Sequence, residues 1–160
     1  MAKRVFFSFH YQRDIWRVNQ IRKAHVVEGT AAAGFQDASL WEETKRKGDE
    51  AIKALIDKGL QGTSVTAVLI GSETSSRKYV KYEIDQSVKR GNSLLGIYIH
   101  NLKDVNGHTC QKGGNPFDNL YYDRNGQRIY LSSIYPTYDW LHNGGYINFS
   151  KWIEVAPSQN

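Results

Sequence analysis

The sequence has a single cysteine, Cys110, and no apolar run as long as the roughly 18 to 20 residues that a membrane-spanning helix needs. One thiol excludes an internal disulfide and fits a reducing compartment. Residues 1–7 begin like a signal peptide, but Ser8 and His10 interrupt the apolar stretch and no small-residue cleavage site follows. We therefore expect a cytoplasmic protein that has no membrane as a partner.

The motifs of two large nucleotide-binding classes are also missing. No G-x-G-x-x-G follows a predicted strand and no G-x-x-x-x-G-K-[ST] occurs, so Rossmann and P-loop folds lose their main support. No repeat and no linker rich in Pro, Gly or Ser divides the 160 residues, an ordinary length for one domain. We expect a single domain over 1–160, with a core at 1–101, an insertion at 102–145 and a C-terminal helix at 146–157.

The charge balance is basic, with a formal net charge of +5 at pH 7. Such an excess favours anionic partners such as nucleotides and phosphates. The basic residues are scattered, and the densest cluster, Lys45-Arg46-Lys47, is of a kind that usually forms a solvated face. Charge alone therefore gives little support to nucleic-acid binding.

Apolar runs and helical patterns alternate along the first hundred residues. The runs are nearly continuous, as in strands covered on both faces, at 5–9, 65–70 and 94–99, with a weaker candidate at 33–35. Helical spacing is found at 14–23, at 49–58 before Gly59, and at 79–90 before Gly91. This alternation predicts an α/β fold, a flavodoxin-like three-layer sandwich around a mainly parallel sheet.

The last third of the chain is rich in aromatic residues. Ten of the twenty Phe, Trp and Tyr residues lie between Phe117 and Trp152. The turn residues 123–126 lie between two apolar segments and predict a hairpin. Apolar residues at helical spacing over 149–156 predict an amphipathic helix. We expect this extension to pack on the sheet, and Phe117, Tyr121 and Trp140 are candidates for a pocket wall or lid.

The ends of the predicted strands locate a candidate site. In an open parallel sheet, ligands bind beyond the carboxyl ends of the strands. The first strand leads into Ser8-Phe9-His10, the middle strand into the polar segment 71–76, and the last into His100-Asn101. These residues suit a polar ligand, although loops are commonly polar for other reasons.

The helix after the middle strand carries the most informative residues. Arg77 and Lys78 in its first turn oppose the helix macrodipole and could hold a phosphate together with free N–H groups. Tyr79 and Glu83 are four residues apart and share one face, at the edge of the buried stripe. Glu83 could therefore reach a ligand in the crevice. The alternatives are that the cations point into water and that Glu83 is an ordinary boundary residue.

Other chemistries have weaker support. His100, His108 and Cys110 do not have the spacing of a standard zinc site, so we expect no metal. Cys110 also lacks the sequence context of a known nucleophile. A receiver domain would need an acidic pair after the first strand, where this chain has Ser8-Phe9-His10.

Several segments resemble one known family. Residues 4–9 resemble the first strand of TIR domains, and 76–84 resemble their W-x-x-x-E helix, with Tyr79 where tryptophan is common. Residues 35–42 and 138–154 extend the similarity. Taken in order, the set resembles the TIR-like ThsB proteins of the bacterial Thoeris antiphage system over roughly residues 4–155.

This resemblance implies an enzyme that cleaves NAD+ between nicotinamide and ribose and makes a cyclic ADP-ribose isomer. In the family this product is a messenger for a separate ThsA-type effector. NAD+ is then a substrate, no tightly bound cofactor is implied, and self-association is possible. The catalytic glutamate of the family corresponds to Glu83. The implied substrate-binding positions are Ser8, Phe9, His10, Asp37, Ser72, Arg77, Lys78 and Tyr79. The alternative function is a non-catalytic TIR-like module that binds nucleotide or acts as a scaffold.

Overall fold

The computed structural model describes residues 3–24, 31–33 and 38–159. Its centre is a five-stranded parallel sheet in the order β2-β1-β3-β4-β7. The strands are β1 (Arg4–Ser8), β2 (Ala31–Ala33), β3 (Val65–Ile70), β4 (Ser93–Tyr98) and β7 (Thr137–Asp139). This is the flavodoxin-like strand order, whose direction of winding reverses between β1 and β3. The predicted fold class is confirmed.

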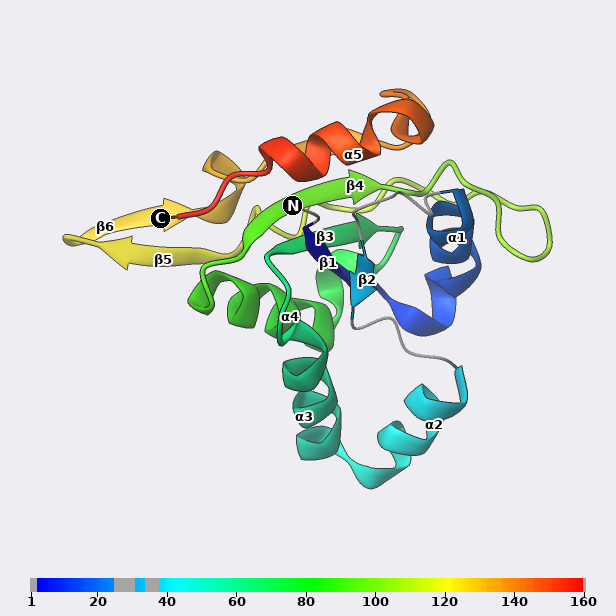
Figure 1. The fold of residues 1–160 in the computed structure, drawn as a ribbon, viewed down its shortest axis with the longest axis horizontal. Helices are drawn as coiled ribbons and strands as arrows, with labels where there is room; N and C mark the ends of the chain where they lie inside the picture. The colour runs from blue at the N-terminus through cyan, green and yellow to red at the C-terminus, as the bar shows by residue number, and fades with distance from the viewer. Residues whose placement is uncertain (1–2, 25–30, 34–37, 160) are drawn as a thin grey trace.

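Helices cover both faces of the sheet (Figure 1). They are α1 (Tyr11–Ala24), α2 (Ala38–Lys47), α3 (Asp49–Leu60), α4 (Lys78–Lys89) and α5 (Gly145–Val155), with short 3-10 turns at Thr74–Ser76 and Leu131–Ser133. The buried clusters show that α1 and α5 pack on one face, while α3 and α4 pack on the other. Helix α2 packs against α3. No helix among the described residues is long and apolar enough to cross a membrane.

The pleat of β1 decides which of its side chains can meet α4. Val5 and Phe7 point into the cluster built with α1 and α5. Phe6 points the other way, into a cluster with Ile52 and other residues of α3. Because successive side chains in a strand alternate between faces, Ser8 lies on the side of Phe6. A polar side chain at the end of a buried strand is thereby turned toward α3 and α4.

The C-terminal extension folds largely as predicted. Strands β5 (Tyr121–Arg124) and β6 (Gln127–Tyr130) form an antiparallel hairpin. Its two turn residues, Asn125 and Gly126, both have positive φ, at 52° and 81°, as a tight type I′ turn requires. Helix α5 buries Phe149 and Trp152 against the sheet. Beyond it, the carbonyl of Pro157 accepts a hydrogen bond from the N–H of Leu94, at the start of β4.

Several features differ from the sequence prediction or were not foreseen, among them β2, which covers Ala31–Ala33 instead of the expected 33–35. Helix α3 does not stop before Gly59 but continues for two more residues, which buries Leu60 completely. The left-handed residue comes later, at Gly62 with φ of 77°. Helix α2 was not predicted, and neither was β7, a strand of only three residues that joins the main sheet beside β4.

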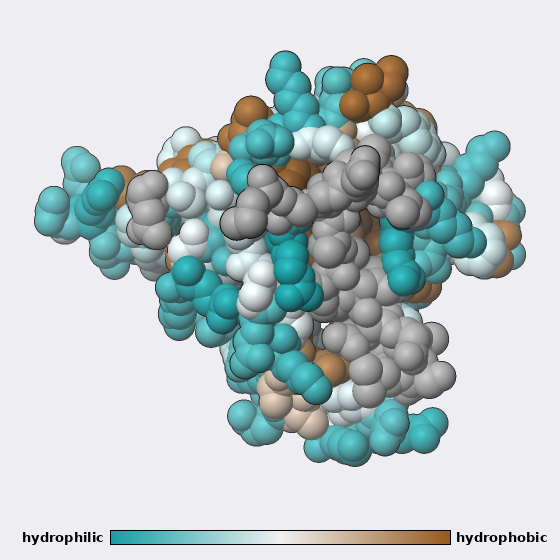
Figure 2. Space-filling model, in the orientation of Figure 1, coloured by the Kyte–Doolittle hydropathy of each residue, from teal (hydrophilic) through white to brown (hydrophobic). Residues whose placement is uncertain are grey.

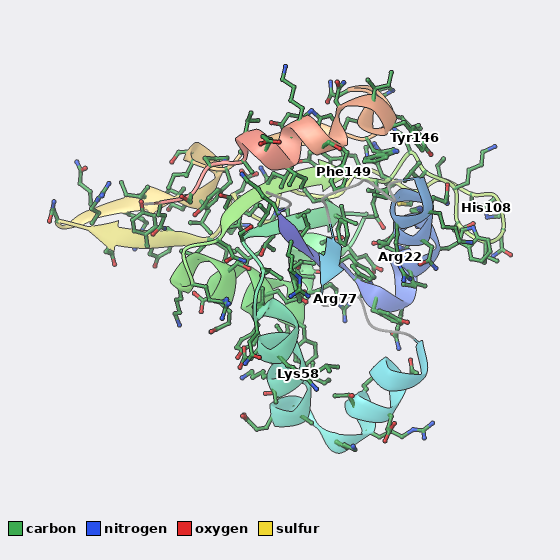
Figure 3. The ribbon with its side chains drawn as sticks, in the orientation of Figure 1. Arg22, Lys58, Arg77, His108, Tyr146 and Phe149 are labelled. Atoms are coloured by element: carbon green, nitrogen blue, oxygen red, sulfur yellow. The ribbon has the colours of Figure 1, made fainter. Side chains whose placement is uncertain are left out.

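The residues coloured in Figure 2 are mostly polar on this face, with apolar side chains at the top over α5. Ile147 is 87% exposed, and Leu141 and Tyr146 are about half exposed. Figure 3 shows Tyr146 and Phe149 on α5 above the sheet and Arg77 in the central part of the molecule. The apolar surface on α5 therefore lies on the side of the sheet opposite α3 and α4.

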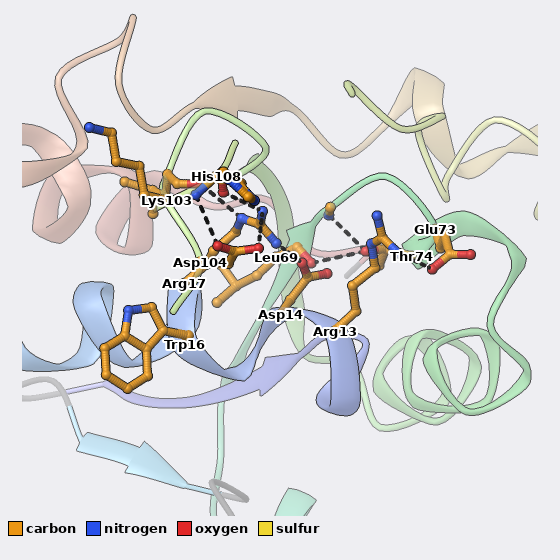
Figure 4. Close-up of polar contacts among 12 residues, drawn as sticks. Arg13, Asp14, Trp16, Arg17, Leu69, Glu73, Thr74, Lys103, Asp104 and His108 are labelled. Carbon is orange, nitrogen blue, oxygen red and sulfur yellow. Dashed lines mark hydrogen bonds and ion pairs between the residues drawn. The ribbon is translucent and has the colours of Figure 1, made fainter. Parts of the chain in front are cut away.

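A buried arginine ties α1 to the loop after β4 (Figure 4). Arg17 is 2% exposed and donates to Asp14 Oδ1 at 3.0 Å and to the carbonyls of Leu102 and His108 at 2.8 and 2.9 Å. Burial raises the pKa of Asp14, while the charge of Arg17 acts in the opposite direction. Arg17 thus pairs with one oxygen of a buried carboxylate and with two loop carbonyls, while Asp14 Oδ2 has no hydrogen-bond partner among the described residues.

Candidate active site

Glu83 and Ser8 are in direct contact although 75 residues separate them. The Ser8 hydroxyl donates to Glu83 Oε1 at 2.8 Å. Ser8 is fully buried at the end of β1, and Glu83 on α4 is only 9% exposed. The strand-end argument and the helical-face argument located these residues separately, and the fold brings them together. The carboxylate therefore lies beyond the carboxyl end of β1, beside the reversal between β1 and β3.

A cavity of about 270 Å³ lies at this position. The described residues that line it are Phe6, Phe7, Phe9, His10, Tyr11, Gln12, Lys45, Ile52, Leu55, Ile56, Arg77, Lys78, Tyr79, Val80 and Glu83. The buried members are apolar except Glu83, whereas the basic members are exposed. The cavity thus combines an apolar, aromatic interior with one carboxylate inside and positive charge toward solvent.

The environment of Glu83 favours its neutral form when the cavity is empty. Burial raises the pKa of Glu83 from its ordinary value of 4.5 to about 8. The hydrogen bond from Ser8 acts in the opposite direction, because it stabilises the carboxylate. A cation placed in the cavity would reverse the balance and favour ionisation. Such a perturbed carboxyl group in a concave site is a common property of catalytic centres.

The two cations at the start of α4 differ in their surroundings. The Lys78 ammonium lies 2.7 Å from Asp49 Oδ1, and the Tyr79 hydroxyl donates to the same carboxylate at 2.8 Å. Hydrogen bonds from Lys78, Tyr79 and Lys53 hold the pKa of Asp49 well below its ordinary value. Arg77 is exposed at the cavity and forms no ion pair with any residue that the structure describes. Arg77 is therefore the better placed of the two for an anionic ligand.

His10 adds a second polar group to the cavity. Its Nδ1 atom is buried and has no hydrogen-bond partner among the described residues. Burial lowers the pKa of His10, and the nearby charge of Arg77 lowers it further. The imidazole is therefore neutral near pH 7 and can donate or accept one hydrogen bond at a ligand.

Comparison with known proteins identifies this scaffold. A family model of Thoeris protein ThsB, TIR-like domain, matches residues 6–104, which include the end of β1 with Ser8, all of α3, and α4 with Glu83. The chain belongs to the ThsB family. A protein of Bacillus cereus (strain MSX-D12) named "Putative cyclic ADP-D-ribose synthase ThsB1" is 42% identical to it over 191 aligned residues. The alignment covers 96% of this chain and all of the relative.

Not every predicted site residue of this ThsB-family chain lies at the cavity. Phe9, His10, Arg77, Lys78, Tyr79 and Glu83 line it, and Ser8 contacts it through Glu83. Ser72 is not among the described lining residues, and its buried Oγ has no partner among them. Its segment is instead covered by Gly113, which packs against the Gly71 carbonyl. Asp37 lies outside the described residues.

The expected aromatic lid from the C-terminal third is not found. Phe117 is buried in the cluster formed by α4, β3 and β4, and Trp140 is buried under α5. Tyr121 packs against Tyr130 on the hairpin. None of these three side chains lines the cavity. Phe117 and Trp140 stabilise other parts of the fold, and Tyr121 is exposed on the hairpin.

Helices α2 and α3 form a part of the cavity wall that was not predicted from the sequence. Ile52, Leu55 and Ile56 form the apolar stripe of α3, which helical periodicity assigns to the core without showing that part of it faces a cavity. Lys45 belongs to the basic cluster taken as a solvated face, yet it lines the cavity from α2. The sequence does place Lys45 a few residues before the apolar stripe of α3, and this proximity is the one indication of a shared cavity wall that it contains.

The described residues contain no group of three His, Cys, Asp or Glu side chains arranged to hold a metal ion. His100 and Cys110 meet through their backbones, where the Cys110 N–H donates to the His100 carbonyl at 2.9 Å.

Proposed function

We propose that the protein cleaves the bond between nicotinamide and ribose in NAD+ and closes the remaining ADP-ribose into a cyclic isomer. The observation that carries the proposal is the buried Glu83 carboxyl at the base of a cavity with cationic groups at its opening. Membership of the ThsB family and the name of the Bacillus cereus relative support the same activity.

One carboxylate is sufficient for this reaction. Nicotinamide in NAD+ carries a positive charge and leaves as a neutral molecule with the electron pair of the broken C–N bond, so no general acid is needed. The ribose passes through an oxocarbenium-like transition state, as in glycoside hydrolysis. Ionised Glu83 would stabilise that charge and accept hydrogen bonds from ribose hydroxyls. A nucleophilic atom of the same molecule would then form a bond to the ribose carbon that nicotinamide has left, and the proton released from the nucleophile would pass to water.

The size and lining of the cavity fit one half of the substrate. A volume of about 270 Å³ is just below the range for sites that hold a whole drug-sized ligand, about 300 to 1,000 Å³. We place the nicotinamide and its ribose inside, among Phe9, Tyr79 and the apolar residues of α3. The phosphates would then lie toward Arg77 and Lys45. Apolar walls exclude water, which favours ring closure over hydrolysis.

The direct test is incubation of the concentrated protein with NAD+, alone and in lysate from phage-infected cells, with products read by mass spectrometry. Release of nicotinamide with a product at the mass of cyclic ADP-ribose supports the proposal. Linear ADP-ribose as the sole product would make the protein a hydrolase. No turnover in either setting would favour the alternative of a non-catalytic nucleotide-binding module.

The proposed activity also determines the expected partners. We propose that the cyclic product is a diffusible messenger in the cytoplasm and acts on a ThsA-type effector, so no stable complex with that effector is required. Purified effector should respond to the small-molecule fraction of the reaction after the protein is removed by filtration. A response only to the unfiltered mixture would contradict this.

The pH dependence of turnover should report the titration of Glu83. Because the carboxylate is the active form, kcat/KM should rise tenfold per pH unit below about pH 8 and level off above it. The cationic nicotinamide favours ionisation, so kcat should level off at a lower pH than kcat/KM. Initial rates between pH 5.5 and 9 measure both. A kcat/KM that is flat across this range would exclude Glu83 as the titrating group.

Arg77→Ala should weaken substrate use and leave the fold intact. A charge-assisted hydrogen bond to phosphate contributes about 1.5 to 3 kcal/mol, so KM should rise roughly tenfold or more while kcat changes little. The exposed side chain has no ion pair to lose among the described residues, so Tm should stay nearly constant. Lys81→Ala, an exposed cation on the same helix that does not line the cavity, is the matched control. Equal effects of both variants would show that only net charge matters.

A further inference from the structure

Two tyrosine–aspartate pairs join α3 to α4. Tyr79 donates its hydroxyl to Asp49 at 2.8 Å, and Tyr82 donates to both oxygens of Asp57 at 2.9 and 3.0 Å. In each pair the tyrosine comes from α4 and the aspartate from α3. Only the first pair touches the cavity, because Tyr79 lines it whereas Tyr82 and Asp57 do not.

Asp49 has more partners than Asp57. Besides the Tyr79 hydroxyl, its carboxylate meets the ammonium of Lys78 at 2.7 Å and that of Lys53 at 3.2 Å. Two of these three partners are the first residues of α4. The N-cap residue of α4, Arg77, makes no side-chain capping hydrogen bond, so the first turn lacks the usual local support. Asp49 supplies an anchor for this turn from the neighbouring helix.

The anchored turn forms the wall beside Glu83. Tyr79 and Glu83 are four residues apart and share one face of α4, so the ring of Tyr79 lies over the turn that precedes the carboxyl group. The ring is also packed against the cluster of Phe6, Ile52 and Ile56. Freeing its hydroxyl end would let the ring move and admit water toward Glu83.

We infer that Asp49 is a positioning residue, which holds Tyr79 and Lys78 in place so that the cavity wall beside Glu83 stays closed. The inference deepens the proposed function, because a closed wall keeps water from the reacting ribose. The same wall also keeps water away from Glu83 when no ligand is bound, so the inference can be tested on the protein without substrate.

The test is a titration of the Glu83 carboxyl carbon by ¹³C NMR in the protein without ligand, with the resonance assigned by Glu83→Gln. Tyr79→Phe is the deciding variant, because it removes the hydroxyl and changes no charge below pH 9. We expect the pKa of Glu83 to fall by at least about half a unit. Tyr82→Phe removes the same group from the matched pair and should leave the pKa of Glu83 unchanged.

The aspartates extend the comparison. Asp49→Ala should lower the pKa of Glu83 further than Tyr79→Phe does, and Asp49→Asn, which keeps an acceptor for the tyrosine, should restore part of the difference. Asp57→Ala should have no effect. Other titratable or charged groups also line the cavity, and each variant keeps all of them apart from the residue that it replaces. They are His10, Tyr11, Lys45, Arg77, Lys78 and Tyr79.

Kinetics supply a second readout. Tyr79→Phe and Asp49→Ala should raise KM for NAD+ by about three- to tenfold, with a shift of the kcat/KM profile toward acid, whereas the Tyr82 and Asp57 variants should match wild type. Because the NMR titration needs no substrate, it remains decisive if the protein proves not to turn over NAD+. An unchanged pKa of Glu83 in Tyr79→Phe, or equal shifts for both pairs, overturns the inference.

Discussion

Glu83→Gln should reduce the rate of NAD+ cleavage by at least about 100-fold, the effect of removing one well-placed electrostatic group from an active site. Glutamine has nearly the same shape and keeps an oxygen that can accept the Ser8 hydroxyl. It cannot supply the negative charge that stabilises the oxocarbenium-like transition state. Nicotinamide release, followed by chromatography at saturating NAD+, measures the loss. A rate within threefold of wild type would mean that another group is the catalytic residue.

The same variant should be more stable than wild type at alkaline pH, which shows that its loss of activity is not a loss of fold. The pKa of Glu83 is about 8 in the folded protein and near 4.5 when unfolded, so the folded state binds the proton more tightly. Stability from this group is present below pH 4.5 and is lost as pH rises to 8. At about 1.4 kcal/mol per pH unit, the free energy of unfolding should shift in favour of Glu83→Gln by on the order of 4 kcal/mol between pH 5 and pH 9. Urea unfolding at both pH values measures this difference.

Arg17→Met should cause the largest loss of stability, about 3 to 5 kcal/mol near pH 8. The substitution keeps a long side chain but leaves the fully buried Asp14 carboxylate without its cation. It also removes the donors for the carbonyls of Leu102 and His108, which attach the loop after β4 to α1. Urea unfolding monitored by tryptophan fluorescence measures the change. A loss below 1 kcal/mol would show that water replaces the guanidinium.

The pH dependence of that loss identifies its cause. Without Arg17, the pKa of Asp14 rises further because burial is no longer opposed. A protonated Asp14 costs less to bury than a charged one, so the deficit of Arg17→Met should shrink from pH 8 to pH 5. Adding Asp14→Asn should recover part of the deficit at pH 8. The exposed ion pair between Arg13 and Glu73 is the control, since its removal by Arg13→Met should cost less than about 1 kcal/mol.

The sequence predicted most of the sheet because buried parallel strands form continuous apolar runs. The runs at 5–9 and 94–99 agree with β1 and β4 within one residue, and Val65–Ile70 agrees with β3 throughout. Strand β7 was missed because three half-buried residues of mixed polarity carry no such signal. Its place beside β4 depends on tertiary contacts made by the segment that follows the hairpin.

At the candidate site, the sequence predicted the central pair, Ser8 and Glu83, but it did not predict the cavity wall that α2 and α3 supply. Position at a strand end indicated Ser8, and position at the edge of a helical stripe indicated Glu83. The contributions of Ile52, Leu55 and Lys45 depend on how α2 and α3 are placed against β1, which periodicity does not encode. Asp49 was missed for the same reason, since it acts on residues of another helix.

The hydrogen bond between Leu94 and Pro157 brings the chain back to the amino-terminal edge of the sheet, while the cavity opens near the carboxyl ends of the strands. A tether fused behind residue 157 therefore leaves from the far side of the molecule. The protein can be immobilised or labelled through that end with its cavity facing free solution. Surface-bound assays and fluorescent tracking during infection can use this orientation without obstructing entry of a dinucleotide.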